Sequence, residues 1–515
     1  MENNHLLTYL VFLPLLGSLI IIFIKKDNEA LIRWFGLFVS IGAFIISLVG
    51  YFQFDRAESG FQFIDKVTWI KSLNVSYFVG VDGISLLLVL LTTFITPLTL
   101  LSSWKSINKK VKEFTFFMLI LEVGIIGVFV SLDMFLFYVF WEAMLIPMYF
   151  IIGIWGHQRR VYAAVKFFLF TMFGSLLMLV AIIWLGVNAI SLTGSFTTNL
   201  LDLYKVGPTI PQTIQTFLFF AFFLSFAIKV PIFPLHTWLP DAHVEAPAAG
   251  SVILAGVLLK LGTYGLLRFC LPLFPQSAQK FAPFIAVLAV IGIIYGALVS
   301  MVQKDMKKLV AYSSVSHLGF VVLGIFALTI ESVQGSVIQM VNHGLSTGAL
   351  FLLVGMIYDR THTREISDYG GIAKIIPVYS AALMIASLSS IGLPGLNNFI
   401  GEFLILVGSF KSPTLGSWWF TAFAATGVIL AAVYLLWMYQ RVVFGEVQHS
   451  NLNSMTDLSL REKIVLVPMF IFIVWIGVYP STFLNLTNTS SNNIINKVLV
   501  LQNPAPSVPD LKINR

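Results

Sequence analysis

The stretch that decides the fold is residues 212–238, QTIQTFLFFAFFLSFAIKVPIFPLHTW. It is long enough to cross a bilayer, which takes about 20 predominantly apolar residues in a helix. Yet Lys229 lies inside it, followed by Pro231 and Pro234. A charge at membrane depth costs roughly 2.5–3.5 kcal/mol on insertion scales, and proline interrupts the hydrogen bonds of a helix. A broken membrane helix that holds a charge is typical of an ion or proton site in a transporter.

The composition of the whole chain agrees with this stretch. Of the 515 residues, 58% belong to the AVILMFWYC set and only 11% are charged. A soluble domain has about 25% charged residues, so the composition excludes soluble enzymes, nucleic-acid-binding domains and secreted disulfide scaffolds. The net charge of +7 is expected of loop lysines and arginines in a multi-span membrane protein, and it does not indicate a nucleic-acid partner.

The cysteine count removes several kinds of chemistry. Cys270 is the only cysteine, which excludes a disulfide within the chain, a cysteine-ligated iron–sulfur cluster and a cysteine-rich zinc site. The sequence has no G-x-x-x-x-G-K-[ST] phosphate loop and no G-x-G-x-x-G motif after a predicted strand. We therefore expect neither cofactor nor metal in this chain, and any coupled redox or ATP chemistry in another subunit.

Fourteen segments are apolar enough and, at about 20 residues each, long enough to cross a bilayer. They predict an all-α integral membrane protein. The first segment lacks the charged start and the cleavage site of a signal peptide. The polar stretch from about 483 to 515 is expected to be a loosely ordered tail. The predicted spans are 3–24, 34–54, 77–102, 113–131, 134–155, 162–187, 212–238, 246–270, 281–302, 308–328, 333–357, 376–410, 417–440 and 464–482.

The loops predict the orientation in the membrane. Most lysines and arginines follow odd-numbered spans, and positively charged loops stay in the cytoplasm. We therefore expect both termini on the non-cytoplasmic side. Once the basic residues at or near span ends are counted with the loops, Lys229 and Lys260 remain, and both lie inside predicted spans.

The ionisable residues at membrane depth resemble the elements of a proton path. Such residues are usually partnered and functional. The alternative for the lysines is that they snorkel to the headgroups, and the alternative for His317 is simple helix packing. Asp82, Asp133, Asp241 and Asp305 lie near span ends and are more typical of helix caps or loop anchors. Besides the two lysines, the set comprises Glu122, Glu142, Glu402, His317 and His343, with His236 near a helix end.

A second interrupted span and a weak repeat refine the fold. Gly392-Leu393-Pro394-Gly395 interrupts the twelfth predicted span, so helices 7 and 12 are both expected to be broken. Val252–Leu259 resembles Val428–Leu435, five spans further along the chain. An odd separation inverts a repeat in the membrane, which predicts inverted five-helix repeats, helices 4–8 and 9–13. The predicted units are residues 1–112 (three helices), 113–270 (first repeat), 281–445 (second repeat) and 446–515 (last helix and polar tail).

Four motifs resemble one family. The stretches Phe140–Tyr149, Ala227–His243, Leu259–Gly265 and Tyr312–Gly319 resemble the antiporter-like membrane subunits of respiratory complex I, and the similarity runs over nearly the whole chain. Within that family the chain is most similar to the M-type chains of bacterial NADH-quinone oxidoreductases, the counterparts of mitochondrial chain 4. It has Glu402 where L- and N-type chains have lysine, and it stops after fourteen spans, whereas L-type chains continue into a long lateral helix.

This resemblance implies roles for the buried residues. Glu142 and Lys229 would form the coupling pair, Lys260 the central relay, His317 a relay in the second half, and Glu402 the terminal group on the exit side. His236 and His343 are weaker candidates. The resemblance also implies a translocase subunit in a bacterial inner membrane, with L- and N-type chains as neighbours. FMN, iron–sulfur clusters and quinone are expected in partner subunits, and this chain alone is not expected to carry out redox catalysis.

The residue types suit proton transfer. Two unit charges about 4 Å apart attract by about 4 kcal/mol at an effective dielectric constant near 20, so separating a Glu–Lys pair changes both proton affinities. Burial disfavours the charged form of a lysine, which allows it to exchange a proton near neutral pH. Three other functions remain open: a subunit of a multi-subunit cation/proton antiporter, a membrane subunit of a membrane-bound hydrogenase, and a purely structural subunit.

Overall fold

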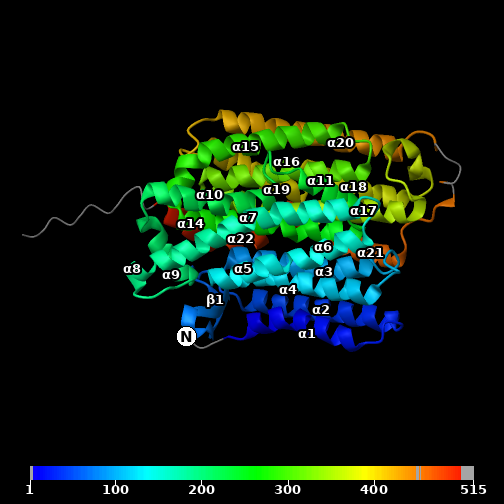
Figure 1. The fold of residues 1–515 in the computed structure, drawn as a ribbon. Helices are drawn as coiled ribbons and strands as arrows, with labels where there is room; N and C mark the ends of the chain where they lie inside the picture. The colour runs from blue at the N-terminus through cyan, green and yellow to red at the C-terminus, as the bar shows by residue number, and fades with distance from the viewer. Residues whose placement is uncertain (1–3, 448–451, 453, 500–515) are drawn as a thin grey trace, which may run out of the picture.

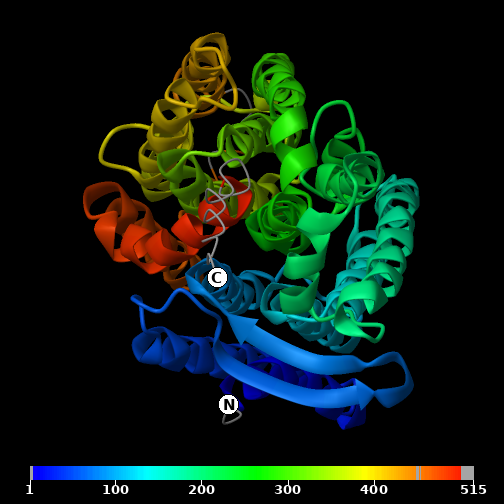
Figure 2. The same ribbon diagram turned by 90° about the vertical axis from the view of Figure 1, so that its left-hand side faces the viewer.

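The computed structural model describes residues 4–447, 452 and 454–499. Its long helices run side by side along one direction, with α1 and α2 at the bottom of the view in Figure 1 and α15 and α20 at the top. A two-stranded antiparallel hairpin lies across one end of the bundle (Figure 2). We call this end the hairpin side. The bundle is the layered helix-on-helix arrangement that the composition predicts.

The elements have the following bounds. The α-helices and strands are α1 (Leu6–Phe23), α2 (Glu29–Gln53), β1 (Gln62–Ile70), β2 (Val75–Val81), α3 (Gly83–Ser102), α4 (Val111–Val130), α5 (Met134–Ala143), α6 (Leu145–Trp155), α7 (Arg160–Asn188), α8 (Ile190–Thr193), α9 (Leu200–Val206), α10 (Gln212–Lys229), α11 (Trp238–Glu245), α12 (Ala248–Ile253), α13 (Leu259–Gly265), α14 (Leu271–Leu273), α15 (Pro275–Met301), α16 (Met306–Ala327), α17 (Ile330–Thr361), α18 (Pro377–Ile391), α19 (Asn397–Phe410), α20 (Trp419–Val443), α21 (Leu460–Val478) and α22 (Ser481–Leu499).

Each predicted span corresponds to helix in the structure. Twelve helical segments of the described residues are individually long and apolar enough to cross a membrane. The broken twelfth span is divided into the two shorter apolar helices α18 and α19. The last span is α21, which bends by 70° into α22. The predicted all-α membrane fold is confirmed.

The centre of the bundle is the eighth span, residues 248–273, which is buried from Ala249 to Leu273. The helix hydrogen bonding of this span switches twice to the wider π form, at Leu254–Leu258 and Leu266–Cys270. Helices α16 and α17 are also almost entirely buried, and α17 packs against both the eighth span and α19. A span that is apolar and covered on all sides has no lipid-facing stripe, so its polar residues lie inside protein.

The hairpin is the first correction to the sequence analysis. The third predicted span, 77–102, begins inside β2, and helix α3 starts only at Gly83. Strand β2 is nearly all apolar and continues directly into an apolar helix, so hydropathy does not separate them. Asp82 marks the true boundary, because its side chain accepts a hydrogen bond from the Ser85 amide at 3.0 Å and caps α3.

The C-terminal region is the second correction. The expected loose tail from about 483 is wrong up to residue 499, because α22 is a helix that packs on α3, α14 and α17. It buries Leu486, Ile494, Ile495 and Val498 on one face and has Asn, Ser and Thr residues on most of the rest. Few apolar residues at helical spacing give a low hydropathy, which explains the error. Residues 500–515 of the predicted tail lie outside the described residues.

The two predicted helix breaks are confirmed. Helix α10 ends at Lys229, and the chain resumes as α11 at Trp238. Helix α18 ends at Ile391, and α19 begins at Asn397. The fifth span also breaks, at Met144 between α5 and α6, which the sequence analysis did not predict.

Candidate functional site

Lys260 lies at the centre of the molecule, in α13 between the two π-helical turns. It is fully buried, so it does not snorkel. Its Nζ donates a hydrogen bond to the carbonyl oxygen of Ala255 in the first π turn. It also lies 2.7 Å from Nδ1 of His343 on α17. One partner is therefore a fixed backbone acceptor and the other is a group that can itself take a proton.

His343 leads on to His317. The two rings come from α17 and α16, and their centroids are 6.1 Å apart. Both side chains are buried, and Nε2 of His343 has no hydrogen-bond partner among the described residues. At this separation a water molecule can link the two rings.

His317 contacts Glu402 directly. Its Nδ1 lies 3.0 Å from Oε1 of Glu402, while Nε2 lies 3.3 Å from both the Ser390 and the Tyr434 hydroxyl oxygens. Glu402 Oε1 also accepts a hydrogen bond from Nε2 of Gln339 at 3.1 Å. The sequence analysis predicted His317 and Glu402. It missed Gln339, Ser390 and Tyr434, because uncharged polar residues are too frequent in these spans to be informative.

The break in the twelfth span positions Glu402. Gly392 ends α18 with φ of +83°, a left-handed conformation that glycine adopts without strain. A Cβ at Gly392 would lie 3.1 Å from Oε2 of Glu402, so the backbone approaches the carboxylate closely. The backbone groups freed by the break are partly satisfied by Asn342 of α17, whose amide donates to the Asn397 carbonyl oxygen at 2.8 Å.

Lys229 has a different environment, although it is also buried. It is the last residue of α10, and within the described part of the chain its Nζ has no hydrogen-bond partner. Instead Nζ lies 5.3 Å from the centre of the Trp141 ring and 5.4 Å from that of Phe167. Aromatic faces attract a cation without accepting its proton.

Glu142 interacts with Lys229 only at longer range. It is the second-last residue of α5, and none of the described residues forms a hydrogen bond to its buried carboxylate oxygen Oε1. The two residues interact electrostatically but are not bonded to each other. The predicted pair is therefore an attraction across a gap. Neither residue forms a hydrogen bond to the Lys260–Glu402 group.

The remaining candidates lie apart from this group. The ring of His236 stacks on Phe233 at 5.7 Å and meets Tyr295 edge-on at 5.1 Å. Glu122 is buried on α4, and neither of its carboxylate oxygens has a hydrogen-bond partner in residues 4–447, 452 or 454–499. His243, to which the sequence analysis gave no role, is buried and stacked on Phe351 at 4.5 Å, and it interacts electrostatically with Lys260.

The aspartates near span ends act as predicted. Asp133 accepts hydrogen bonds from the amides of Phe135 and Leu136 and caps α5. Asp305 caps α16 in the same way. Asp241 instead forms an ion pair with Lys166 at 2.7 Å. These three carboxylates are therefore structural anchors of loops and helix starts.

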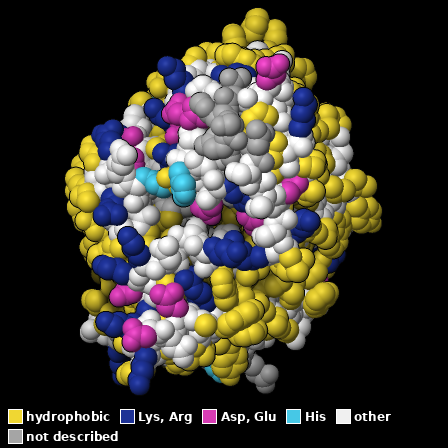
Figure 3. Space-filling model, turned by 90° about the vertical axis from the view of Figure 1, so that its right-hand side faces the viewer, with side chains coloured by type: hydrophobic (Ala, Val, Ile, Leu, Met, Phe, Trp, Pro, Cys, Tyr) yellow, Lys and Arg dark blue, Asp and Glu magenta, His cyan; other side chains and the backbone are white. Residues whose placement is uncertain are grey.

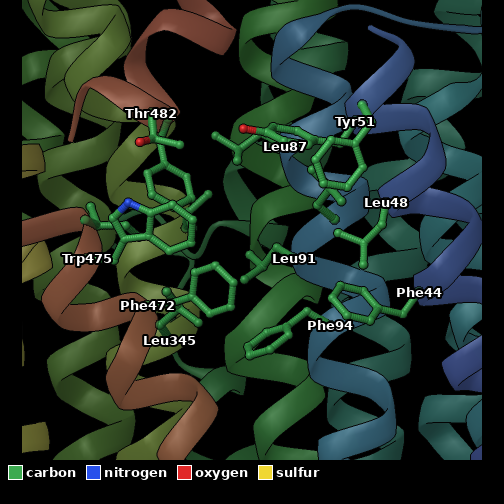
Figure 4. Close-up of a pocket in the computed structure, with 15 residues that line it drawn as sticks. Phe44, Leu48, Tyr51, Leu87, Leu91, Phe94, Leu345, Phe472, Trp475 and Thr482 are labelled. Atoms are coloured by element: carbon green, nitrogen blue, oxygen red, sulfur yellow. The ribbon is translucent and has the colours of Figure 1, made fainter. Parts of the chain in front are cut away.

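The structure also has a large apolar pocket. It has a volume of about 290 Å³ and is lined by side chains from α2, α3, α17, α21 and α22, among them Phe44, Phe94 and Trp475 (Figure 4). None of its lining residues is charged or a histidine. It therefore has no carboxylate, imidazole or amine that could exchange a proton with the buried charges.

Comparison with known proteins identifies the family. The family model for the membrane part of NADH:quinone oxidoreductases and Mrp antiporters matches residues 131–433, and the model for the amino terminus of NADH-ubiquinone oxidoreductase chain 4 matches residues 9–128. NADH-quinone oxidoreductase subunit M of Rhodobacter capsulatus is 46% identical over 503 residues, 96% of each chain. This chain belongs to the NADH:quinone oxidoreductase/Mrp antiporter family.

Solved structures of the family have the same fold. A chain of respiratory complex I from Thermus thermophilus with bound NADH is 31% identical and superposes with a TM-score of 0.86, covering 96% of this chain and 99% of that chain. A chain of the Mrp complex from Dietzia superposes with a TM-score of 0.80 over 96% of this chain and 99% of that chain, at 16% identity. The second likeness concerns the fold alone.

Proposed function

We propose that this chain is the M-type membrane subunit of a proton-translocating NADH:quinone oxidoreductase. The observation that carries the proposal is the buried series Lys260, His343, His317 and Glu402. Direct contacts of 2.7 and 3.0 Å flank two imidazole rings whose centroids lie 6.1 Å apart. Every member can bind and release a proton. The 46% identity to an oxidoreductase subunit favours this function over that of an antiporter.

The proposed transfer begins at Lys260. A buried ammonium gives up its proton more readily than an exposed one, and His343 is positioned to receive it. A water between the imidazoles would carry the proton to His317, whose other nitrogen faces the Glu402 carboxylate. Moving one charge outward against 100 mV costs about 2.3 kcal/mol, which a change in proton affinity at Lys260 can supply.

Glu142 and Lys229 set that affinity in the proposed mechanism. They lie on α5 and α10, outside the Lys260 series, and interact without a direct bond. A movement in a neighbouring L- or N-type subunit would change their separation, and the altered field at Lys260 would release its proton. FMN, iron–sulfur clusters and quinone would act in partner subunits, so this chain would carry out no redox step itself.

The inverted repeat and the orientation belong to the same proposal. Asp133 and Asp305 both cap a helix and both form an isolated β-bridge, with Asn199 and Glu365 respectively. Asp133 contacts the Ser76 amide of the hairpin, whereas Asp305 contacts Arg364 in a loop that follows α17.

The side opposite the hairpin displays many Lys and Arg residues (Figure 3), as a cytoplasmic face would. Helix α1 would then start on the non-cytoplasmic side.

Replacement of Lys260 tests this function. In native membranes, Lys260→Ala should lower NADH:quinone electron transfer and coupled proton pumping together, by about tenfold or more, since a positioned proton carrier contributes about 100-fold or more. Lys280→Ala is the matched control, because Lys280 is exposed. The proposal is wrong if the assembled Lys260→Ala complex transfers electrons and pumps like the wild type.

A further inference from the structure

A second buried cation lies on the same span as Lys260. Arg268 is in the π turn Leu266–Cys270, toward the hairpin side and about 12 Å further along the helix at 1.5 Å per residue. Its side chain is 4% exposed and forms an ion pair with Asp82 at 2.6 Å. Asp82 directly follows β2, so this pair closes the hairpin-side end of the eighth span.

Three groups besides Asp82 hold the Arg268 guanidinium in place. Nε donates to the Tyr264 hydroxyl at 3.2 Å, and the terminal nitrogen that contacts Asp82 also lies 3.3 Å from the Ser85 hydroxyl. The ring of Phe61, from the loop before β1, lies 4.9 Å from the guanidinium carbon. An arginine with this many partners is fixed in position, and it does not release its proton in proteins.

Helix α22 adds another cation. Lys497 interacts electrostatically with both Arg268 and Asp82, and its Nζ lies 4.4 Å from the Tyr204 ring centre. The same helix packs on the start of α3, where the Gly83 amide donates to the Ser490 hydroxyl at 3.0 Å. Two cations therefore surround one carboxylate, and the cluster of Arg268, Asp82 and Lys497 carries a net positive charge.

We propose that this cluster is an electrostatic plug that prevents a proton on Lys260 from escaping directly to the hairpin side. The inference rests on the proposed function of Lys260. A fixed cation in a low-dielectric environment repels an incoming proton, and arginines act as such barriers in membrane pores. The plug contains no histidine, and its lone carboxylate is engaged by Arg268. The proton therefore leaves sideways through His343, His317 and Glu402.

The contrast with the Lys260 series explains why the two directions differ. Toward Glu402, Lys260 meets His343, which can accept a proton. Toward the hairpin side the Thr263 hydroxyl donates to the Lys260 carbonyl oxygen, and the Tyr264 hydroxyl already contacts the Phe129 carbonyl oxygen and Ser85. Beyond it lies the permanently charged Arg268. One direction offers groups that change protonation, and the other offers a group that does not.

Passive proton leakage tests the plug. The whole complex is reconstituted in liposomes without NADH, a potassium diffusion potential is imposed with valinomycin, and proton flux is followed with an internal pH dye. Arg268→Gln should raise the flux several-fold over the wild type, whereas Arg268→Lys, which keeps the charge, should stay near the wild type. Arg56→Gln, at an exposed arginine on the same side, is the control.

The double variant Arg268→Gln/Lys260→Ala separates the two hypotheses. If the leak passes through Lys260, the double variant should return to wild-type flux. Wild-type flux in an assembled Arg268→Gln complex overturns the plug. If Lys260→Ala alone abolishes pumping in that case, the proposed function stands without the plug. If Arg268→Gln does not assemble, Lys497→Gln takes its place, with a smaller increase expected and wild-type flux again contradicting the plug.

Discussion

The two intramembrane lysines are equally buried but differ in what they touch. Lys260 has a titratable partner, His343, at 2.7 Å and stands at one end of a series that reaches Glu402. Lys229 lies between two aromatic rings, and its carboxylate partner Glu142 is not in direct contact. A cation in contact with a base can transfer a proton to it. For a cation attracted across a gap, the interaction energy changes with the distance to its partner. The Lys260–Glu402 region is therefore suited to proton transfer, and the Glu142–Lys229 region to setting when transfer occurs.

The largest expected effect is at the end of the transfer region. Glu402→Gln should reduce proton pumping by about tenfold or more, because the amide cannot take the proton from His317. Pumping is measured in membrane vesicles energised with NADH. Glu331→Gln is the matched control, since Glu331 forms an exposed ion pair with Lys411 at 3.1 Å and such pairs contribute about 0–1 kcal/mol. Equal pumping by Glu402→Gln and Glu331→Gln would show that Glu402 is not part of the proton path.

An intermediate effect is expected at the Glu142–Lys229 pair, where the negative charge of residue 142 should matter more than a direct contact with Lys229. Glu142→Gln should lower NADH:quinone electron transfer by several-fold, because it removes the attraction on Lys229. Glu142→Asp keeps the carboxylate but shortens the side chain by one methylene, and it should retain most of the activity. The rates of both variants are compared in native membranes. If Glu142→Asp loses as much activity as Glu142→Gln, the Glu142–Lys229 pair depends on a precise contact. The proposed difference between this pair and the Lys260–Glu402 series would then be wrong.

The smallest effect is expected at a neutral partner of His317. Tyr434→Phe removes a hydroxyl that lies 3.3 Å from Nε2 of His317 and leaves the Glu402 contact intact. A typical hydrogen bond contributes about 1 kcal/mol, so pumping should fall by no more than about fivefold. Tyr439→Phe, whose hydroxyl donates to the Ser380 carbonyl oxygen instead, is the control. A loss as large as that of Glu402→Gln would mean that Tyr434 itself carries the proton.

The sequence predicted what stands out against an apolar background. Lys229, Lys260, Glu142 and Glu402 were found because a charge inside a membrane span is rare and costly. The breaks of helices 7 and 12 were found because proline and glycine disrupt a helix locally. Strand β2 and helix α22 were missed because their hydropathy resembles, respectively, that of a span and that of a polar tail.

The contacts themselves could not be predicted. His343 was ranked below His317, yet it is the group that Lys260 touches, through packing of α17 on the eighth span. The π turns that flank Lys260 depend on tertiary packing and have no sequence signature here. The gap between Glu142 and Lys229 is also a result of helix packing, since the sequence indicates only that opposite charges are present.

The most direct test of the central claim is a double-mutant comparison of Lys260→Ala and Glu402→Gln. Residues that act in one series are not additive, because removing either one already stops transfer. NADH-driven proton pumping is measured in vesicles that contain the assembled complex, for both single variants and the double variant. The account predicts that the double variant pumps no less than the more damaged single variant. A double loss equal to the product of the two single losses would show that Lys260 and Glu402 act independently, and would contradict a single path.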